Sequence, residues 1–353
     1  MPSSAAPPVP ADRGPAVDRR EPVHGVPPGL RDAVNRPVVV VTGASSGIGR
    51  GVARALAARG ADLVLAARTE RTLAAVARDC ERRGGRALVV PTDVADEAAV
   101  QVLARRAVEG FGRIDAWVNA AAVWSYGLFE DTPGPVFRQI VDTTLFGQVH
   151  AARAVLPQFR AQGRGVLVNV GSLYGRLSSP YVAPYVVSKW GLLGFSEVLR
   201  QELRDAPGIA VCTVLPGAVD TPIYRHAANY VGRRIRPLPP VTSPERVVAA
   251  VVRAVDRPRR EIVVGRTQYV AVWAHRLVPG LYDRLIGPVV KTFAVRGAPV
   301  PPHDGTVFVP DSLPCAVDDG WRRHDHRVVG GAVTVTAALA ALAAAVRGLR
   351  RRR

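Results

Sequence analysis

The sequence predicts an α/β fold in which buried parallel strands alternate with helices. Short apolar runs at Val38–Val41 and Ile209–Leu215 have the composition of strands. Between such strands, stretches including Thr69–Gly84 and Asp96–Gly110 place their apolar residues at helical spacing. A strand that is apolar almost throughout, such as Gly165–Gly171, is typical of a parallel sheet covered on both faces.

A glycine-rich turn follows the first strand directly, and a helical pattern continues from it through Arg59. Its three glycines permit a tight turn, the close approach of a pyrophosphate and close helix packing, while the helix N-terminus offers free N–H groups to phosphate. A glycine-rich turn alone is weak evidence, but here a strand precedes it and a helix follows. The cofactor-binding residues predicted in this turn are Thr42, Gly43, Ser45, Ser46, Gly47, Ile48 and Gly49.

Tyr185 and Lys189 lie four residues apart, so on a helix they share one face. A free tyrosine titrates near pH 10, and proton transfer at neutral pH needs its pKa to fall by roughly three units, or about 4 kcal/mol. A nearby positive charge supplies much of this change. Of the 47 Lys+Arg residues only Lys189 and Lys291 are lysine, so a lysine at this spacing indicates acid–base chemistry. The alternative is an ordinary helix face.

Ser172 follows the predicted strand Gly165–Gly171 and precedes Tyr185 by 13 residues. At the carboxyl edge of a parallel sheet its hydroxyl can face a ligand. A serine after a strand is usually a helix cap or a turn residue. Its position relative to Tyr185 is what makes it a candidate.

These motifs, in this order, resemble the short-chain dehydrogenase/reductase family: Thr-Gly-x-x-x-Gly-Ile-Gly, then Ser, then Tyr-x-x-x-Lys, with a likeness that spans about residues 37–265. The resemblance implies a Rossmann-type, doubly wound sheet of seven parallel strands, usually in a homo-oligomer. It implies hydride transfer between a nicotinamide cofactor and a carbonyl/alcohol substrate. It assigns Tyr185 as catalytic acid/base, Lys189 as ribose ligand and modulator of the phenol pKa, and Ser172 as hydrogen-bond partner of the substrate oxygen.

The end of the second predicted strand, Ala61–Ala67, indicates which cofactor is preferred. A carboxylate there would bind the adenosine ribose of NAD and repel the 2′-phosphate of NADP. The chain instead continues with Arg68, which favours NADP; the alternative is a solvated residue at a helix start. After the third strand the resemblance implies that Asp93 and Val94 flank the adenine, although Asp93 could simply cap a turn.

Two departures from the family pattern follow. The fourth strand, Ile114–Asn119, ends in Asn119-Ala-Ala where the family has Asn-Ala-Gly, which adds a methyl group near the cofactor. In the predicted long helix from Pro135 to Ala161, Thr144 stands where relatives often carry an asparagine that relays a proton through water to the lysine. We expect Thr144 to keep this catalytic relay in altered form, with an effect on turnover rate rather than on reaction type.

The carboxyl end of the sixth strand carries a further cofactor motif. Pro216-Gly217-x-x-x-Thr221 resembles the family segment that holds the nicotinamide amide, although Pro-Gly after a strand is often just a turn. The family places its substrate lid at the irregular stretch Pro222–Val241, and the loop 173–184 is well placed to line the pocket. The helix that begins at Tyr185 is commonly a subunit interface in this family.

Composition limits the other classes of function. The formal charge of +18 could indicate a nucleic-acid binder, but the arginines are scattered and no recognition motif is present, so this class is disfavoured. The three cysteines, Cys80, Cys212 and Cys315, are isolated and lack metal-ligand spacing, so neither a metal site nor a disulfide framework is predicted. No secretion signal is apparent, and a cytoplasmic location is expected.

Four regions are predicted along the chain. Residues 1–36 contain eight prolines and no apolar periodicity and are expected to be disordered. Residues 37–265 form the dinucleotide-binding domain, and residues 266–327 form a C-terminal extension in which Tyr269–Phe293 is expected to be helical. Residues 328–353 are an apolar, Ala-rich segment with an Arg-rich end.

The last region raises the question of membrane association. Val328–Val346 has 19 residues without a charge, which is about 28 Å as a helix and marginal for a bilayer. The heavier positive flank after it should stay cytoplasmic, and a single span would then separate the domain from its reduced cofactor. Peripheral or interfacial attachment, or a tail with little orientation signal, is therefore favoured over a span. The alternative to an active enzyme is a membrane-attached nucleotide-binding scaffold that has lost turnover, and the substrate stays open.

Overall fold

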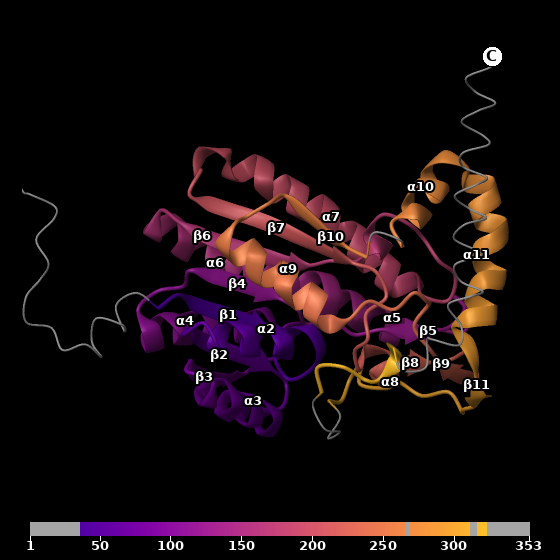
Figure 1. Ribbon diagram of the computed structural model, residues 1–353, viewed down its shortest axis with the longest axis horizontal. Helices are drawn as coiled ribbons and strands as arrows, with labels where there is room; N and C mark the ends of the chain where they lie inside the picture. The colour runs from indigo at the N-terminus through magenta and orange to yellow at the C-terminus, as the bar shows by residue number, and fades with distance from the viewer. Residues whose placement is uncertain (1–35, 266–267, 311–315, 323–353) are drawn as a thin grey trace, which may run out of the picture. The chain divides into compact units, whose positions relative to one another are not determined.

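The computed structural model describes residues 36–265, 268–310 and 316–322. Its main feature is a seven-stranded sheet whose neighbouring strands are all parallel (Figure 1). This confirms the predicted Rossmann-type, doubly wound fold. The strands, in spatial order, are β10 (Glu261–Val264), β7 (Ile209–Pro216), β6 (Gly165–Val170), β4 (Ala116–Asn119), β1 (Val38–Thr42), β2 (Asp62–Ala67) and β3 (Arg86–Pro91).

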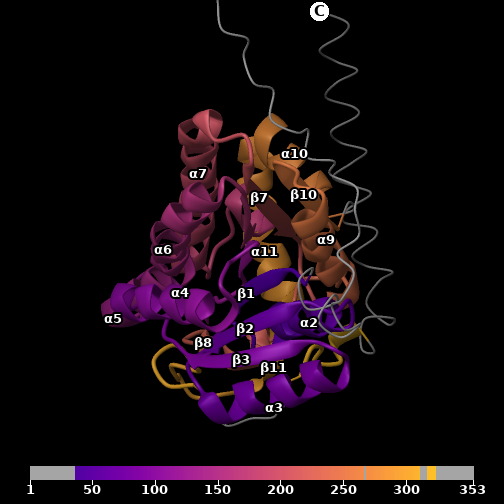
Figure 2. The same ribbon diagram turned by 90° about the vertical axis from the view of Figure 1, so that its left-hand side faces the viewer.

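Helices cover both faces of the sheet, so each strand has two apolar faces (Figure 2). Along β1, Val39 and Val41 pack into one core, whereas Val40 packs with Trp117 into the other. This alternation explains why the strands are apolar at nearly every position. The covering helices are, on the first face, α2 (Gly47–Ala57), α3 (Glu70–Arg82) and α9 (Pro244–Asp256), and on the second, α4 (Glu97–Phe111), α6 (Gly147–Gln162) and α7 (Ala183–Glu202).

The predicted single helix from Pro135 to Ala161 is wrong in one respect, because it is interrupted. The segment consists of α5 (Gly134–Val141), a π-helical turn at Asp142–Phe146 and then α6. The buried Thr144 lies in this turn, and its hydroxyl both donates to Val123 O and accepts from Val123 N, each at 3.2 Å. A π-turn of this kind inserts one residue into the helical register, often at a functional site.

Smaller differences concern element ends. The fourth strand begins at Ala116 rather than Ile114. Helix α9 begins directly after Ser243, whose side chain makes no capping hydrogen bond. At α4, by contrast, the Asp96 carboxylate accepts from Ala98 N and Ala99 N as a helix cap.

The segments after β7 build a second layer beside the carboxyl edge of the sheet. The stretch Pro222–Val241, predicted to be irregular, contains three short elements, and the expected helices of the extension are present and pack on the domain through Tyr282 and Val290. The elements of this layer are α8 (Ile223–His226), β8 (Ala228–Asn229), which pairs with β5 (Ser125–Tyr126), β9 (Arg233–Ile235), which pairs with β11 (Val295–Pro299), α10 (Val270–Leu277) and α11 (Pro279–Phe293).

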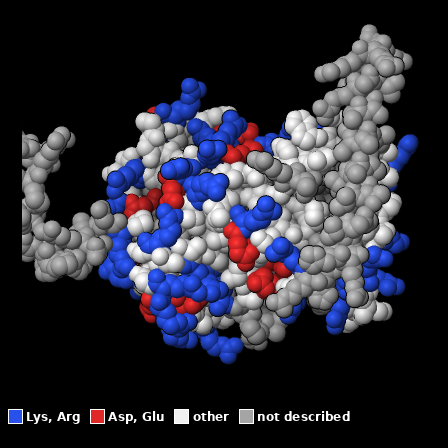
Figure 3. Space-filling model, in the orientation of Figure 1, with Lys and Arg blue, Asp and Glu red and all other residues white. Residues whose placement is uncertain are grey.

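Basic side chains are spread over several elements of the surface with acidic side chains between them (Figure 3). Several arginines form ion pairs, among them Arg59 with Asp256 at 2.8 Å. Within residues 36–265, 268–310 and 316–322, no helix is both long and apolar enough to cross a membrane. The predicted disordered segment 1–36, apart from its last residue, and the apolar segment 328–346 lie outside the described residues.

Candidate active site

The glycine-rich turn lies between β1 and α2 and packs against the end of β4. Gly43 has a φ of 66°, and a Cβ at this position would lie 2.7 Å from Ala121 N. A Cβ at Gly49 would lie 2.2 Å from Gly43 O. Only glycine fits at either position, and the resulting close approach of backbone to cleft suits a bound pyrophosphate.

A cleft of about 190 Å³ runs along the carboxyl ends of β1, β2, β3 and β4. It spans the point between β1 and β4 where the strand order reverses, which is where open α/β sheets bind ligands. The predicted cofactor-binding residues that line it are Gly43, Ser45, Ser46, Gly47, Ile48, Arg68, Asp93, Val94 and Thr221.

Two other predicted cofactor residues, Thr42 and Asn119, do not line the cleft but connect the strand ends beside it. The Thr42 hydroxyl accepts from Ala120 N at 3.3 Å and so joins the end of β1 to the end of β4. The Asn119 amide accepts from Trp117 Nε1 at 2.9 Å and donates to Asn169 Oδ1 at 3.0 Å. The Asn119 side chain therefore belongs to a buried polar network beneath the site.

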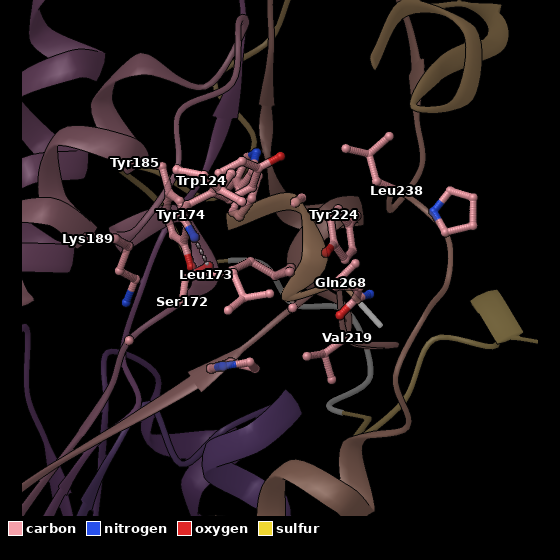
Figure 4. A pocket seen from close by; sticks show the side chains of 18 of the residues that line it. Trp124, Ser172, Leu173, Tyr174, Tyr185, Lys189, Val219, Tyr224, Leu238 and Gln268 are labelled. Atoms are coloured by element: carbon pink, nitrogen blue, oxygen red, sulfur yellow. Dashed lines mark hydrogen bonds between the residues drawn. The ribbon is translucent and has the colours of Figure 1, made fainter. Parts of the chain in front are cut away.

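Tyr185 and Lys189, from the first two turns of α7, converge with Ser172, which follows β6 (Figure 4). The Tyr185 hydroxyl is hydrogen-bonded to Ser172, and Lys189 Nζ lies 5.3 Å from the centroid of the Tyr185 ring. Lys189 Nζ donates to Val170 O at 2.8 Å, which fixes the amine below the ring. Ser172 also caps a 3-10 turn by accepting from Tyr174 N at 3.1 Å, so the two interpretations of this serine are compatible.

Burial controls the electrostatics of this group. Desolvation raises the pKa of Tyr185, and the hydrogen bond with Ser172 opposes that rise only in part. Desolvation also lowers the pKa of Lys189 to about 7. The sequence-based expectation of a lowered phenol pKa is therefore not met in the protein alone, because the apolar surroundings disfavour both the phenolate and the ammonium ion.

A second cavity, of about 240 Å³, opens over Ser172 and Tyr185. The Trp124 ring lies 4.0 Å, centroid to centroid, from Tyr185, and 5.6 Å and 5.8 Å from Tyr174 and Tyr224. Helices α10 and α11 complete a largely apolar wall. The segment around Leu238 lies in the same wall (Figure 4). The predicted residues Pro216, Gly217 and Thr221 lie in this wall, so the nicotinamide motif borders the cavity.

Sequence reasoning missed the aromatic part of this wall. Trp124 comes five residues after the end of β4, and aromatic side chains shortly after a strand, at the edge that carries the glycine-rich turn, were the available signal. Gln268 was missed as well, because it comes after the last strand of the sheet. Among the described residues, the buried atoms Trp124 Nε1 and Gln268 Oε1 have no hydrogen-bond partner although both residues line the cavity.

The cleft and the cavity adjoin each other, because residues from the glycine-rich turn, the end of β4 and the segment after β7 line both. The wall between the glycine-rich turn and the cavity that holds Tyr185 is therefore common to both hollows. The residues common to both are Ile48, Ala120, Ala122, Trp124, Thr221 and Ile223.

Arg68 lies half-buried at the adenosine side expected for the cleft, so it is not a solvated helix-start residue. Its Nη2 donates to Thr306 O at 2.6 Å, and its Nη1 donates to Val307 O and Phe308 O at 3.1 Å and 3.2 Å. Burial lowers the pKa of Arg68, and the negative charge of Asp93 opposes this effect. Asp93 itself accepts from Ala95 N at 3.0 Å, as a turn residue would.

Thr144 does not line either cavity. Its hydroxyl is engaged by the backbone of Val123, and Lys189 Nζ donates to Val170 O, so within the described part of the chain no direct hydrogen bond links Thr144 to Lys189. Thr144 supports the residues next to Trp124 through this contact.

Comparisons with known proteins agree with this geometry. Residues 37–230 match the family model described as short chain dehydrogenase. An uncharacterised oxidoreductase, YxnA, of Bacillus subtilis (strain 168) is 32% identical over 296 residues, which cover 81% of this chain and 82% of that protein. Dehydrogenase/reductase SDR family member 7B of Mus musculus is 31% identical over 268 residues, covering 73% and 81%.

Solved structures show the same likeness. An alcohol dehydrogenase of the archaeon Thermococcus sibiricus, in complex with 5-hydroxy-NADP, matches with a TM-score of 0.56 and 26% identity over 65% of this chain and 96% of that one. A putative short-chain alcohol dehydrogenase of Sinorhizobium meliloti 1021 matches with a TM-score of 0.57 and 28% identity, covering 64% and 94%. The chain belongs to the short-chain dehydrogenase/reductase family of oxidoreductases.

Proposed function

We propose that the protein is an NADP(H)-dependent oxidoreductase that interconverts a carbonyl group and an alcohol on an apolar substrate. The observation that carries the proposal is the convergence of Tyr185, Ser172 and Lys189 in an apolar cavity that shares part of its wall with the cleft beside the glycine-rich turn. When bound, the nicotinamide supplies or accepts the hydride.

The chain's own residues handle the proton and the substrate oxygen. The Ser172 and Tyr185 hydroxyls bind the oxygen, and Tyr185 donates its proton during reduction and accepts one during oxidation. Its neutral form, favoured by burial, is the form needed to donate. Lys189 uses one of its donors on Val170 O, which leaves N–H groups for the cofactor ribose and a charge for the phenolate.

NADP is favoured over NAD because β2 ends without a carboxylate and Arg68 follows it. A cationic guanidinium at this place attracts a 2′-phosphate, whereas a carboxylate would repel it. The solved relative that carries 5-hydroxy-NADP supports the same choice.

The substrate class follows from the cavity. An aromatic and aliphatic wall stabilises an apolar body, since each buried apolar Å² contributes roughly 25 cal/mol. The donor Trp124 Nε1 and the acceptor Gln268 Oε1 are available to a second polar group of the substrate. We therefore propose ketones or aldehydes with a bulky apolar part, or the corresponding alcohols.

NADPH oxidation with cyclohexanone, acetophenone and benzil, against the polar ketone dihydroxyacetone, tests the proposal. We expect turnover of the apolar probes, and a loss of about 10²–10⁴-fold in Tyr185→Phe, the range typical of general acid–base catalysis. Tyr269→Phe, which removes a hydroxyl outside both cavities, serves as the control and keeps the wild-type rate. Equal rates in wild type and Tyr185→Phe would refute the assignment.

A catalytically impaired nucleotide-binding scaffold is the second candidate. The engagement of Thr144 with Val123, in place of the family asparagine, is the observation that favours it. This candidate predicts NADPH binding with equally negligible turnover in wild type and in Tyr185→Phe.

We also propose that the chain forms a homo-oligomer through α7. Its outer side exposes the large apolar residues Val187, Trp190 and Val198, each close to half exposed. Light scattering after gel filtration should give a mass of two or more times the 37.6 kDa of one chain. A monomeric mass would contradict this proposal.

A further inference from the structure

The C-terminal extension reaches the cofactor cleft from outside the region that matches the family model, which ends at residue 230. We call residues 303–310 the return segment. Three consecutive carbonyls in it, those of Thr306, Val307 and Phe308, accept hydrogen bonds from the guanidinium of Arg68. Thr306 and Pro310 also line the cleft together with Arg68.

The fold fixes the return segment independently of Arg68. His303 exchanges two backbone hydrogen bonds with Asn229, at 2.8 Å and 3.0 Å, and Thr306 N donates to His226 O at 2.9 Å. The Tyr230 hydroxyl donates to the Asp304 carboxylate. Val307 is fully buried in an apolar cluster that includes Ile140. The three carbonyls are thus a preformed receptor for a cation.

A later part of the extension is attached to the same region of the molecule. Ala316 O accepts from Gly47 N at 2.8 Å at the start of α2. The buried Asp220 carboxylate accepts three backbone N–H groups, those of Asp319, Trp321 and Arg322, at 2.9–3.1 Å. The extension is therefore held at two places along the cleft.

The pattern of donors on Arg68 leaves one edge of the guanidinium available. An arginine has five N–H donors, and the two on Nη1 and one on Nη2 go to the carbonyls. In the described part of the chain the Arg68 guanidinium donates to these three carbonyls, so the Nε–H and the second Nη2–H are left. These two groups lie side by side and form the edge that binds phosphate or carboxylate in a bidentate manner.

We propose that the return segment positions Arg68 for the 2′-phosphate of NADP, and that the extension is thereby a determinant of cofactor choice. This inference rests on the proposed NADP(H) dependence. A free arginine side chain must lose its rotamer freedom on binding phosphate, whereas the return segment imposes that order in advance. The segment raises affinity for the phosphorylated cofactor and leaves affinity for NADH nearly unchanged.

Gly305→Ala is the variant that displaces the return segment. Gly305 has a φ of 55°, and a Cβ there would lie 2.2 Å from His226 O, so the backbone must move. Gly232→Ala is the matched control: its φ is 71°, but a Cβ at Gly232 meets nothing within 4 Å. Both variants introduce alanine at a left-handed residue, and only the first one pushes the carbonyls away from Arg68.

Dissociation constants for NADPH and NADH, measured by fluorescence titration, test the inference without any turnover. For Gly305→Ala we expect NADPH binding to weaken about tenfold and NADH binding to change by less than about twofold. Gly232→Ala should leave both constants at their wild-type values. In an Arg68→Gln background, Gly305→Ala should have no further effect on NADPH binding, since the arginine it acts through is gone.

If Gly305→Ala does not fold, Tyr230→Phe, which removes the phenol bond to Asp304, replaces it and should shift NADPH binding in the same direction to a smaller extent. Equal weakening of NADPH and NADH, tighter NADPH binding, or a full effect in the Arg68→Gln background would each overturn the inference. Failure of the wild type to bind either dinucleotide would instead refute the proposed function.

Discussion

Lys189 allows a quantitative test because its environment is so unlike water. The residue is 2% exposed, and its Nζ donates a hydrogen bond to Val170 O. Burial disfavours the ammonium form and lowers its pKa from 10.5 to about 7. As the pH rises, Lys189 therefore loses its charge in the folded protein at a lower pH than in the unfolded chain.

The size of the effect on stability follows from the interval between the pKa of Lys189 in the unfolded chain and its pKa in the folded protein. An interval of 3.5 pH units corresponds to about 5 kcal/mol at about 1.36 kcal/mol per unit. The folded state prefers the neutral amine, so between pH 7 and 10.5 the unfolded chain binds more protons. The free energy of unfolding due to Lys189 thus rises with pH across this window and is flat below it.

The chain has only two lysines, which makes the pKa directly measurable. In protein labelled with ¹³C at lysine Cε, two resonances are expected, and Lys291→Arg removes one of them and assigns the other. The Lys189 resonance should titrate with a midpoint near 7. We expect the free energy of unfolding, measured with urea, to rise more with pH in the wild type than in Lys189→Met. The difference between the two proteins should increase by roughly 2–3 kcal/mol from about pH 7 to 9.

A Lys189 midpoint near that of a free lysine, with a pH-independent stability difference, would refute the reasoning. It would show that the amine is solvated, and the apolar enclosure of the site would then be wrong. Any fixed cost of replacing lysine by methionine cancels in the pH dependence, so the test does not rely on it.

Three further changes have defined outcomes. Thr144→Ala leaves Val123 N and O unpaired in a buried place and should lower the free energy of unfolding by about 1–3 kcal/mol, measured by urea denaturation; an unchanged value would contradict the contact. Asp220→Asn converts one acceptor into a donor facing backbone N–H groups and should lower the melting temperature, whereas an equal temperature would show that the extension is held otherwise. Trp124→Phe keeps the aromatic wall but removes the unpaired Nε1–H, so KM should rise only for ketones that carry a second acceptor; a uniform rise would point to lost packing instead.

The sequence was informative where function depends on local spacing. The glycine-rich turn, Ser172 and the Tyr185–Lys189 pair each lie within one strand–turn–helix unit or one helical turn, so their geometry follows from nearby residues. Their order along the chain indicated the family, and the family implied the seven-stranded sheet that the structure has.

What the sequence did not predict depends on distant contacts. Arg68 contacts carbonyls 238 to 240 positions away, a relation that no local pattern encodes. The raised pKa of Tyr185 arises from burial beside side chains such as Trp124, which comes from another segment, so it could not be predicted from the lysine four residues later. The Thr144 hydroxyl in the π-turn likewise bonds the backbone of Val123, 21 positions away.

The most direct test of the site is hydride tracing. The wild type is incubated with acetophenone and NADPH deuterated at its reactive ring carbon, and the alcohol is analysed by mass spectrometry alongside that from Tyr185→Phe, with NADPH affinity measured for both. We predict that the wild type delivers deuterium to the carbonyl carbon, and that Tyr185→Phe binds NADPH normally yet forms almost no labelled alcohol. Labelled product at the same rate from both proteins would contradict the role given to Tyr185, Ser172 and Lys189.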